Sequence, residues 1–272
     1  MAGLGEGRSA RGQGAPSGSE LFALSTLGLL AFFALWYGVA SSGWVPSRFL
    51  PGPVMIADTI ARLSDHSYAG YTIEAHTVAS LQRFGLGFGL AVVLGVPLGL
   101  LMGWYRWVDD VVAPLFESVR FIAPIAWVPF AALWFGTGIG GPILIIFSGA
   151  FPPCVINAYR GARQVDTVFV EAAQTLGAGG LRIITEVLVP AALPSIVAGL
   201  RISAGLGWQS LIGAELIVVS SGVGYLMVQG QTSLQTPIVM SAMVAIGVVG
   251  FAIDVALRAL ESAVQRSWGV EP

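Results

Sequence analysis

Residues 171–177 have the sequence EAAQTLG, and after nine further residues positions 187–190 have the sequence VLVP. Glu, Ala, Gln and Leu favour a helix, which Gly177 can end with a cap or a sharp bend. Leu181–Val189 resumes a helical apolar pattern, and we expect Pro190 to stop it. Because long apolar stretches flank this segment on both sides, we predict a helix, a turn and a second helix lying on a membrane surface.

The composition indicates an integral membrane protein. Hydrophobic residues make up 55% of the 272, charged residues 10%, and the mean hydropathy is +0.79, whereas about a quarter of a soluble protein is charged. All thirteen basic residues are Arg, which excludes a Walker A phosphate loop and a Schiff base on this chain. Cys154 is the single cysteine, so an intrachain disulfide and a cysteine metal cluster are excluded as well. We expect no catalytic residue and no metal, and the net charge of −2 gives no indication of nucleic-acid binding.

Apolar runs of membrane-spanning length predict an all-α membrane protein with six transmembrane helices. Residues 1–20 contain too little apolar surface to order themselves and predict a disordered cytoplasmic tail, which leaves 21–272 as the transmembrane domain. The expected spans are 21–40, 84–102, 111–135, 142–157, 193–217 and 237–260. We expect Pro152 and Pro153 to interrupt the fourth span, and 220–235 to form a polar re-entrant or outer loop.

Arginine counting predicts that both termini and the loop 160–190 are cytoplasmic. With the N-terminus inside, eight arginines fall on the cytoplasmic side and three on the outer side. The cytoplasmic set is Arg8, Arg11, Arg106, Arg160, Arg163, Arg182, Arg258 and Arg266, and the outer set is Arg48, Arg62 and Arg83. His66 and His76, in the outer segment, lack acidic or Cys neighbours at ligand spacing, so we expect surface histidines.

Charged side chains within the predicted spans are costly and usually face a cavity or a partner. They fall on two stripes with helical spacing: Arg120, Pro124, Trp127, Ala131 and Trp134 in the third span, and Arg201, Gly205, Trp208, Ile212 and Glu215 in the fifth. Glu117 can pair with Arg120 at i, i+3, which leaves a structural and a pathway role open for Arg120. Arg201 and Glu215 are roughly 21 Å apart along one helix, so each needs another partner. Arg201 could also snorkel to the interface. The candidate pathway residues are Arg120, Trp127, Arg201, Trp208 and Glu215.

The segment 171–190 resembles the EAA loop of binding-protein-dependent ABC importer permeases, which has Glu-Ala-Ala, three residues, Gly, nine residues and an apolar-x-apolar-Pro close. Val187 and Val189 stand where Ile and Leu are commoner. The sequence RFIAPIAWVP at 120–129, AGLR at 198–201 and LPGP at 50–53 resemble the taurine, sulfonate, nitrate and bicarbonate branch of that family. The resemblance covers roughly residues 45 to 268 and implies a type I (MetI-like) permease fold.

The resemblance implies a non-catalytic subunit that forms the pathway of an ATP-driven importer in the bacterial inner membrane. Its ATPase-coupling residues would be Glu171, Ala172, Ala173, Gly177 and Pro190. The implied partners are an ABC ATPase subunit, which binds the ATP and Mg, an extracytoplasmic substrate-binding protein, a second copy of this chain and membrane lipid. No nucleic acid is implied. The implied cargo is a small solute such as taurine, another organic sulfonate, nitrate or bicarbonate.

Two other classes of protein are compatible with an apolar chain. A secondary transporter driven by an ion gradient usually shows inverted repeats and midplane acids, but no clear repeat emerges here and Asp254 is the main acid of the late spans. An intramembrane enzyme would need a Ser, Cys or His constellation within the spans, and Cys154 has no His near it in any of them.

Overall fold

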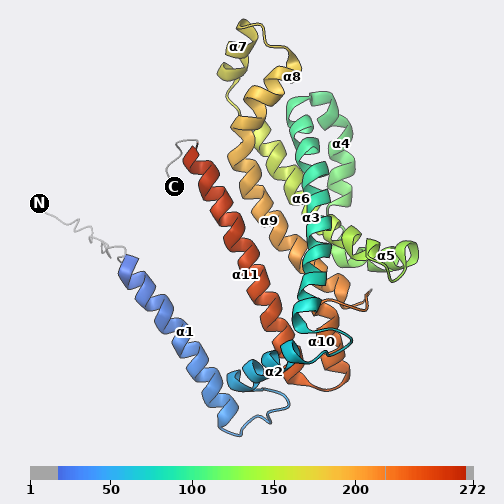
Figure 1. The fold of residues 1–272 in the computed structure, drawn as a ribbon. Helices are drawn as coiled ribbons and strands as arrows, with labels where there is room; N and C mark the ends of the chain where they lie inside the picture. Colours follow the sequence, from blue (N-terminus) through green and yellow to red (C-terminus); the bar gives the residue numbers. More distant parts are fainter. Residues whose placement is uncertain (1–17, 218, 268–272) are drawn as a thin grey trace, which may run out of the picture. The chain divides into compact units, whose positions relative to one another are not determined.

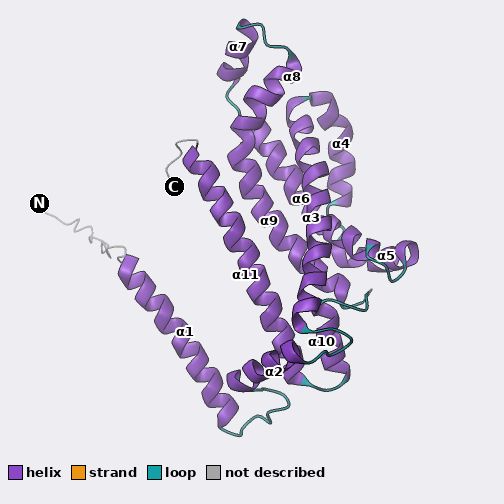
Figure 2. Ribbon diagram, viewed as in Figure 1, coloured by secondary structure: helices purple, strands orange, loops and turns teal. Residues whose placement is uncertain are grey.

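The computed structural model describes residues 18–217 and 219–267, and within them the chain is almost entirely helical (Figure 2), which confirms the all-α prediction. Residues 1–55 and 56–272 form two compact units, which we describe separately. Of the predicted tail, positions 1–17 lie outside the described residues, and 18–20 begin the first helix.

Eleven α-helices, one 3-10 turn and one π turn follow one another along the described residues (Figure 1). In chain order they are α1 (Gly18–Ser41), α2 (Pro53–Asp65), α3 (Ile73–Trp104), α4 (Arg106–Val119), the 3-10 turn Pro124–Trp127, α5 (Val128–Phe135), α6 (Gly140–Arg163), α7 (Thr167–Thr175), α8 (Gly180–Ile183), the π turn Ile184–Leu188, α9 (Val189–Glu215), α10 (Val223–Thr232) and α11 (Thr236–Ser267).

Five of the described helices are long and apolar enough to cross a membrane, and a sixth span results if a bent pair is counted as one. The bent pair is Arg106–Val119 with Pro124–Phe135, at 85°. The span expected over 111–135 is therefore not one continuous helix but a bent pair. Ala123 has an extended backbone (φ −57°, ψ 138°), because the ring of Pro124 disfavours the helical conformation in the residue before it.

Two other local expectations are corrected. Pro152 and Pro153 lie inside the continuous helix α6. Neighbouring helices satisfy backbone groups near such prolines, and here the Ser203 hydroxyl of α9 donates to the Ala150 carbonyl. The polar loop expected at 220–235 instead contains α10. Its apolar side chains pack with those of neighbouring helices in a cluster of Leu63, Ile73, Val223, Leu226, Ile238 and Ala242.

Helix α3 packs along α6, and α6 along α9, so that these three helices form the core of the second unit (Figure 1). Glycines of α3 allow this close approach, since a Cβ at Gly87, Gly95, Gly99 or Gly103 would collide with α6. At Gly99 the added atom would overlap the Val155 carbonyl and lie 2.8 Å from the Ala158 Cβ. Four of the six glycines of α3 are therefore explained by helix contact, and Gly85 and Gly89 face open space.

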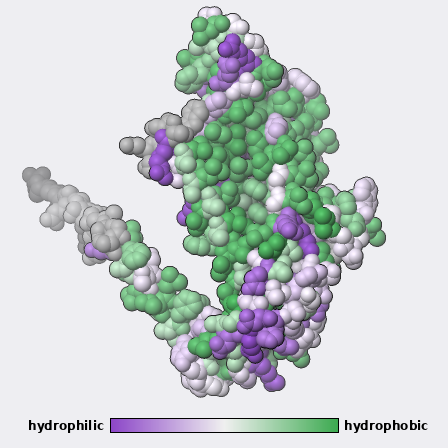
Figure 3. Space-filling model, viewed as in Figure 1, coloured by the Kyte–Doolittle hydropathy of each residue, from purple (hydrophilic) through white to green (hydrophobic). Residues whose placement is uncertain are grey.

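The surface of the second unit is apolar along the middle of α9 and α11 and hydrophilic toward its two ends (Figure 3). One hydrophilic end carries α7 and α8, and the other lies around α10. An apolar band between two polar ends is the surface that a lipid bilayer requires.

Replacing Gly99 by Val should lower the thermal stability of the purified chain, because the new side chain cannot fit between α3 and α6. We expect a loss of about 1–3 kcal/mol or more from overpacking. Gly89→Val is the matched control on the same helix, since nothing lies within 4 Å of its Cβ position. Thermal unfolding in detergent measures both, and equal midpoints for the two variants would contradict the packing of α3 on α6.

Candidate functional site

Helix α7 carries the EAA sequence and is defined at both ends by local hydrogen bonds. The Asp166 carboxylate accepts from the Val168 N–H at 3.0 Å and caps the N-terminus. At the other end the Gly177 N–H donates to Gln174 O (2.9 Å) and the Ala178 N–H to Ala173 O (3.0 Å). These two bonds form a Schellman motif, which places Gly177 at φ +80°. The predicted helix end at Gly177 is confirmed.

The loop 160–190, which we call the EAA loop, exposes apolar side chains. Phe169 is 62% exposed, Leu176 89% and Leu181 77%. Glu171 and Ala172 are exposed too, and Ala173 is half-buried. An exposed apolar patch on an ordered segment marks a contact surface for another molecule.

We expected Pro190 to end the helix, and this prediction is wrong. Pro190 lies in the first turn of α9. A π turn precedes it, in which the Val189 N–H bonds to Ile184 O. The wider turn shifts the bonding pattern ahead of the proline, so the helix continues through it. Residues Gly180–Glu215 consequently form one span of 36 residues, from the EAA loop to the far end of α9.

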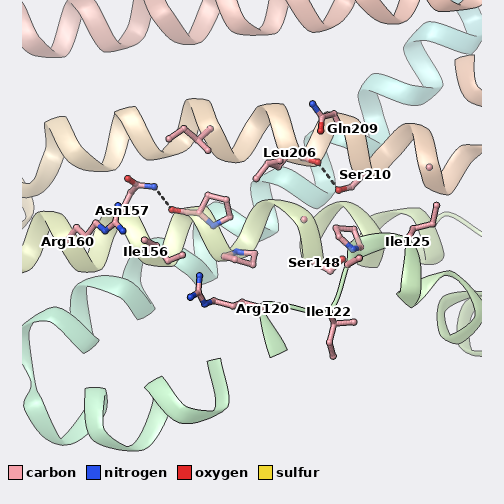
Figure 4. Close-up of a pocket in the computed structure, with 17 residues that line it drawn as sticks. Arg120, Ile122, Ile125, Ser148, Ile156, Asn157, Arg160, Leu206, Gln209 and Ser210 are labelled. Atoms are coloured by element: carbon pink, nitrogen blue, oxygen red, sulfur yellow. Dashed lines mark hydrogen bonds between the residues drawn. The ribbon is translucent and has the colours of Figure 1, made fainter. Parts of the chain in front are cut away.

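A cavity of about 620 Å³ lies between α6, α9 and the bend before α5 (Figure 4). Its polar lining comes from Arg120, Ser148, Asn157, Arg160, Gln209 and Ser210, and the rest is apolar, proline or glycine. The only charged groups among its lining residues are two arginines. Arg120 Nε bonds to the Glu117 carboxylate at 2.6 Å, which confirms the expected i, i+3 pair.

The other four candidate pathway residues lie away from the lining of this cavity. Trp127 packs with the cluster of Val128, Ala131, Ile145 and Ala214. Arg201 lines an adjoining cavity and pairs with Asp254 (2.7 Å) and Glu261 (3.5 Å). Trp208 is buried and meets the Phe84 ring edge-on, with ring centroids 5.5 Å apart. The expected stripe from Arg120 to Trp134 does not form, because the 85° bend divides it.

Glu215 is fully buried and bonds to Arg83 Nη1 at 2.9 Å, which supplies the partner that we expected it to need besides Arg201. Ser80 Oγ lies 2.7 and 2.8 Å from the two carboxylate oxygens, and the Gly224 N–H donates to the same group at 3.0 Å. Arg83 Nη1 also donates to the Ser221 carbonyl at 2.8 Å. The pair thus joins α3, the end of α9 and the start of α10.

His76 belongs to the same cluster and is fully buried, so the expectation of a surface histidine is wrong. Its Nδ1 accepts from the Gly222 N–H at 3.0 Å and its Nε2 lies 3.1 Å from the Tyr68 carbonyl. These partners fit a neutral ring protonated at Nε2. The spacing of His76, Ser80 and Arg83, at i, i+4 and i+7, places them on one helix face and could have revealed the cluster.

Up to six candidate spans, one of them bent, an exposed EAA loop and a cavity with two arginines in a largely apolar lining are features of a transport permease. The sequence profile of the family described as binding-protein-dependent transport system inner membrane component matches residues 95–267, and the chain belongs to this family.

Relatives and solved structures agree with this membership. The taurine transport system permease protein TauC of Escherichia coli is 33% identical over 89% of both chains. SsuC of Bacillus subtilis, named for aliphatic sulfonates transport, is 35% identical over 84% of this chain and 81% of its own. The bicarbonate transport system permease protein CmpB of Synechococcus elongatus is 32% identical over 85% of both. An inward-facing MetNI methionine ABC transporter shares the fold, with a TM-score of 0.60 and 22% identity over 71% of this chain and 95% of that one.

Arg83→Ala should strongly destabilise the protein, because it leaves the Glu215 carboxylate buried without its cation. Breaking a buried pair in this way costs about 3–5 kcal/mol. Arg182→Ala is the control, since its bridge to Glu186 is exposed (68% and 59%) and such pairs contribute about 0–1 kcal/mol. Denaturation of both variants in detergent measures the difference, and similar losses of stability would refute the assigned role of the buried pair.

Proposed function

We propose that this chain is the transmembrane permease subunit of an ATP-driven ABC importer, working as a homodimer with a separate ATPase on each EAA loop. The observation that carries the proposal is the loop itself: a capped helix with a Schellman bend and exposed apolar side chains, continuous with the long helix that reaches the cavity. Glu171, Ala172, Ala173, Gly177 and Pro190 are the proposed coupling residues.

ATP and Mg would bind to the ATPase subunit, because a chain without lysine has no phosphate loop of its own. A substrate-binding protein would deliver the cargo from outside. ATP-driven closure of the two ATPases would draw the two EAA loops together and tilt α9 and the helices packed on it, which opens the cavity outward. The subunit itself carries no catalytic step in this proposal.

The proposed cargo is a small anion, with an organic sulfonate such as taurine as the first choice and nitrate or bicarbonate as related candidates. Its support is the naming of relatives for taurine, aliphatic sulfonates and bicarbonate. The cavity with Arg120 is the proposed start of the pathway in each subunit. Trp127, Arg201, Trp208 and Glu215 would shape the helices around it, since they lie outside its lining.

Gly177→Asp should abolish transport while the chain still inserts and assembles. Residue 177 has a positive φ, which costs an L side chain of order 1 kcal/mol, and the charge falls where the ATPase would dock. We expect uptake in proteoliposomes to be lost and the ATPase to stop responding to the loaded binding protein. Gly177→Ala should show a milder form of the same defect.

Gly179→Ala is the matched control for Gly177→Ala. Gly179 lies two residues away with φ −76°, and open space surrounds its Cβ position as it does at Gly177. Wild-type uptake and wild-type stimulated ATPase in Gly177→Asp would make the EAA loop an ordinary connection and remove the main support of the proposal.

The proposed orientation places both termini in the cytoplasm of a bacterial cell, with the chain in the inner membrane. A reporter fused after Gln265, near the end of α11, should then be active on the cytoplasmic side. The same reporter placed in the segment between α10 and α11, after Leu234, should report the periplasm. The opposite pattern would overturn the orientation and separate the EAA loop from any cytoplasmic ATPase.

A further inference from the structure

The three arginines that border the two cavities beside α9 differ in how far they are neutralised. Arg201 lies between two acids, Asp254 and Glu261. Arg120 is held by Glu117 through Nε. Arg160, at the end of α6, forms no ion pair or side-chain hydrogen bond with any described residue. Of these three arginines, Arg160 is therefore the one whose charge has no bonded partner among the described residues.

Arg160 and Arg120 line the same cavity, and Figure 4 shows Arg160 beside Asn157 at one end of it and Arg120 nearer the middle. No acidic side chain is among the described residues that line this cavity. A third, smaller cavity shares Arg120 and Arg160, and the acids Asp109 and Glu117 line that one. Glu117 is paired with Arg120, whereas Asp109 accepts from the neutral Tyr159 hydroxyl at 3.0 Å and forms no ion pair with a described residue.

The polar groups at this end of the cavity are mainly donors. Among the described residues, none accepts from the guanidinium N–H groups of Arg160, and Arg120 bonds to a side chain only through its Nε contact with Glu117. Asn157 uses one amide hydrogen on the Pro153 carbonyl at 2.9 Å and has a second one left. Ser148 and Ser210, farther along, spend their hydroxyl hydrogens on backbone carbonyls.

We propose that Arg160, with Arg120 and Asn157, forms an oxyanion-binding station in this cavity, which selects a sulfonate or similar anion during transport. Arg160 is exposed and Arg120 is half-buried, so the attraction for an anion comes from two positive charges on one cavity rather than from deep burial. The planar fork of a guanidinium matches two oxygens of an oxyanion. The role in transport rests on the function proposed above, whereas the station itself is a property of the isolated chain.

Charged thiol reagents test the station without any substrate, ATPase or binding protein. Ile156 lies one helical turn before Arg160 and lines the same cavity, so Ile156→Cys in a Cys154→Ser background gives a single reporter thiol. The full chain in lipid nanodiscs is treated with an anionic sulfonatoethyl or a cationic trimethylammonioethyl methanethiosulfonate. The rate with the anionic reagent divided by the rate with the cationic reagent measures the electrostatic potential at this position.

With Arg160 present, the ratio should exceed that of a free thiol in the same buffer. Arg160→Gln should lower it about tenfold, because a unit charge one turn away acts with opposite sign on the two reagents. Arg160→Lys should keep it and Arg160→Glu should invert it. Arg163→Gln is the matched control, since it removes the same charge from the same helix end but lies outside the cavity lining, over the Tyr159 ring.

Binding is tested with methanesulfonate and with the neutral dimethyl sulfone of similar size. Methanesulfonate should slow the anionic reagent when Arg160 is present and not in Arg160→Gln, and dimethyl sulfone should have no effect. Equal rate ratios in Arg160→Gln and Arg163→Gln would overturn the proposal, and so would equal protection by methanesulfonate and dimethyl sulfone. Arg160 would then be an arginine that only reaches the lipid interface.

Transport measurements separate this inference from the proposed function. In the assembled importer, Arg160→Gln should reduce uptake at least tenfold while the ATPase still responds to the loaded binding protein. Uptake at the wild-type level would show that the station does not act in transport. If the wild-type chain supports no ATP-driven uptake but passes the labelling tests, the proposed function fails and the oxyanion station stands.

Discussion

The buried contact between Arg83 and Glu215 is the constraint on which the arrangement of the second unit depends. A carboxylate with no exposed surface needs a full set of donors, and it receives them from two side chains of α3 and from the backbone at the start of α10. The same contact closes the end of α9, where the chain must leave the helix. Helices separated by more than a hundred residues are thereby fixed at one point, and the cavity walls formed by α6 and α9 extend from it.

Features encoded within one or two turns could be predicted from the sequence. The end of α7 at Gly177 and the Glu117–Arg120 pair follow from local spacing. Long-range partners could not be predicted in this way, because the choice of partner for Glu215 depends on which helix lies beside it. Arg83 is 132 residues away from it along the chain.

The prolines show the same division between local and tertiary control. Pro124 acts as its chemistry alone dictates and forces Ala123 out of the helix. Pro153 and Pro190 are carried within helices, because neighbouring packing and a π turn accommodate their rings. A rule that proline ends a helix is thus right where the chain is free to turn and wrong where the flanking turns are held in place.

Within the cavity, the electrostatic character is set by which acids are absent rather than by the number of arginines. Arg201 and Arg120 stood out in the sequence because they fall in the middle of apolar stretches, yet both have carboxylates in reach. Arg160 drew attention only as one more cytoplasmic charge. Whether Arg160 has a bonded partner depends on how several helices pack around it, and no single stretch of sequence contains that information.

The π turn at Ile184–Leu188 absorbs one surplus residue within a continuous helix. A π turn holds one residue more than the α-helical turn it replaces. Deleting one residue there would exchange one turn for another and leave α8 facing nearly the same direction around the axis of α9. The extra residue is therefore neutral for the direction of the EAA loop, and its effect is confined to the hydrogen bonds ahead of Pro190, where the chain has to pass a residue without an N–H group.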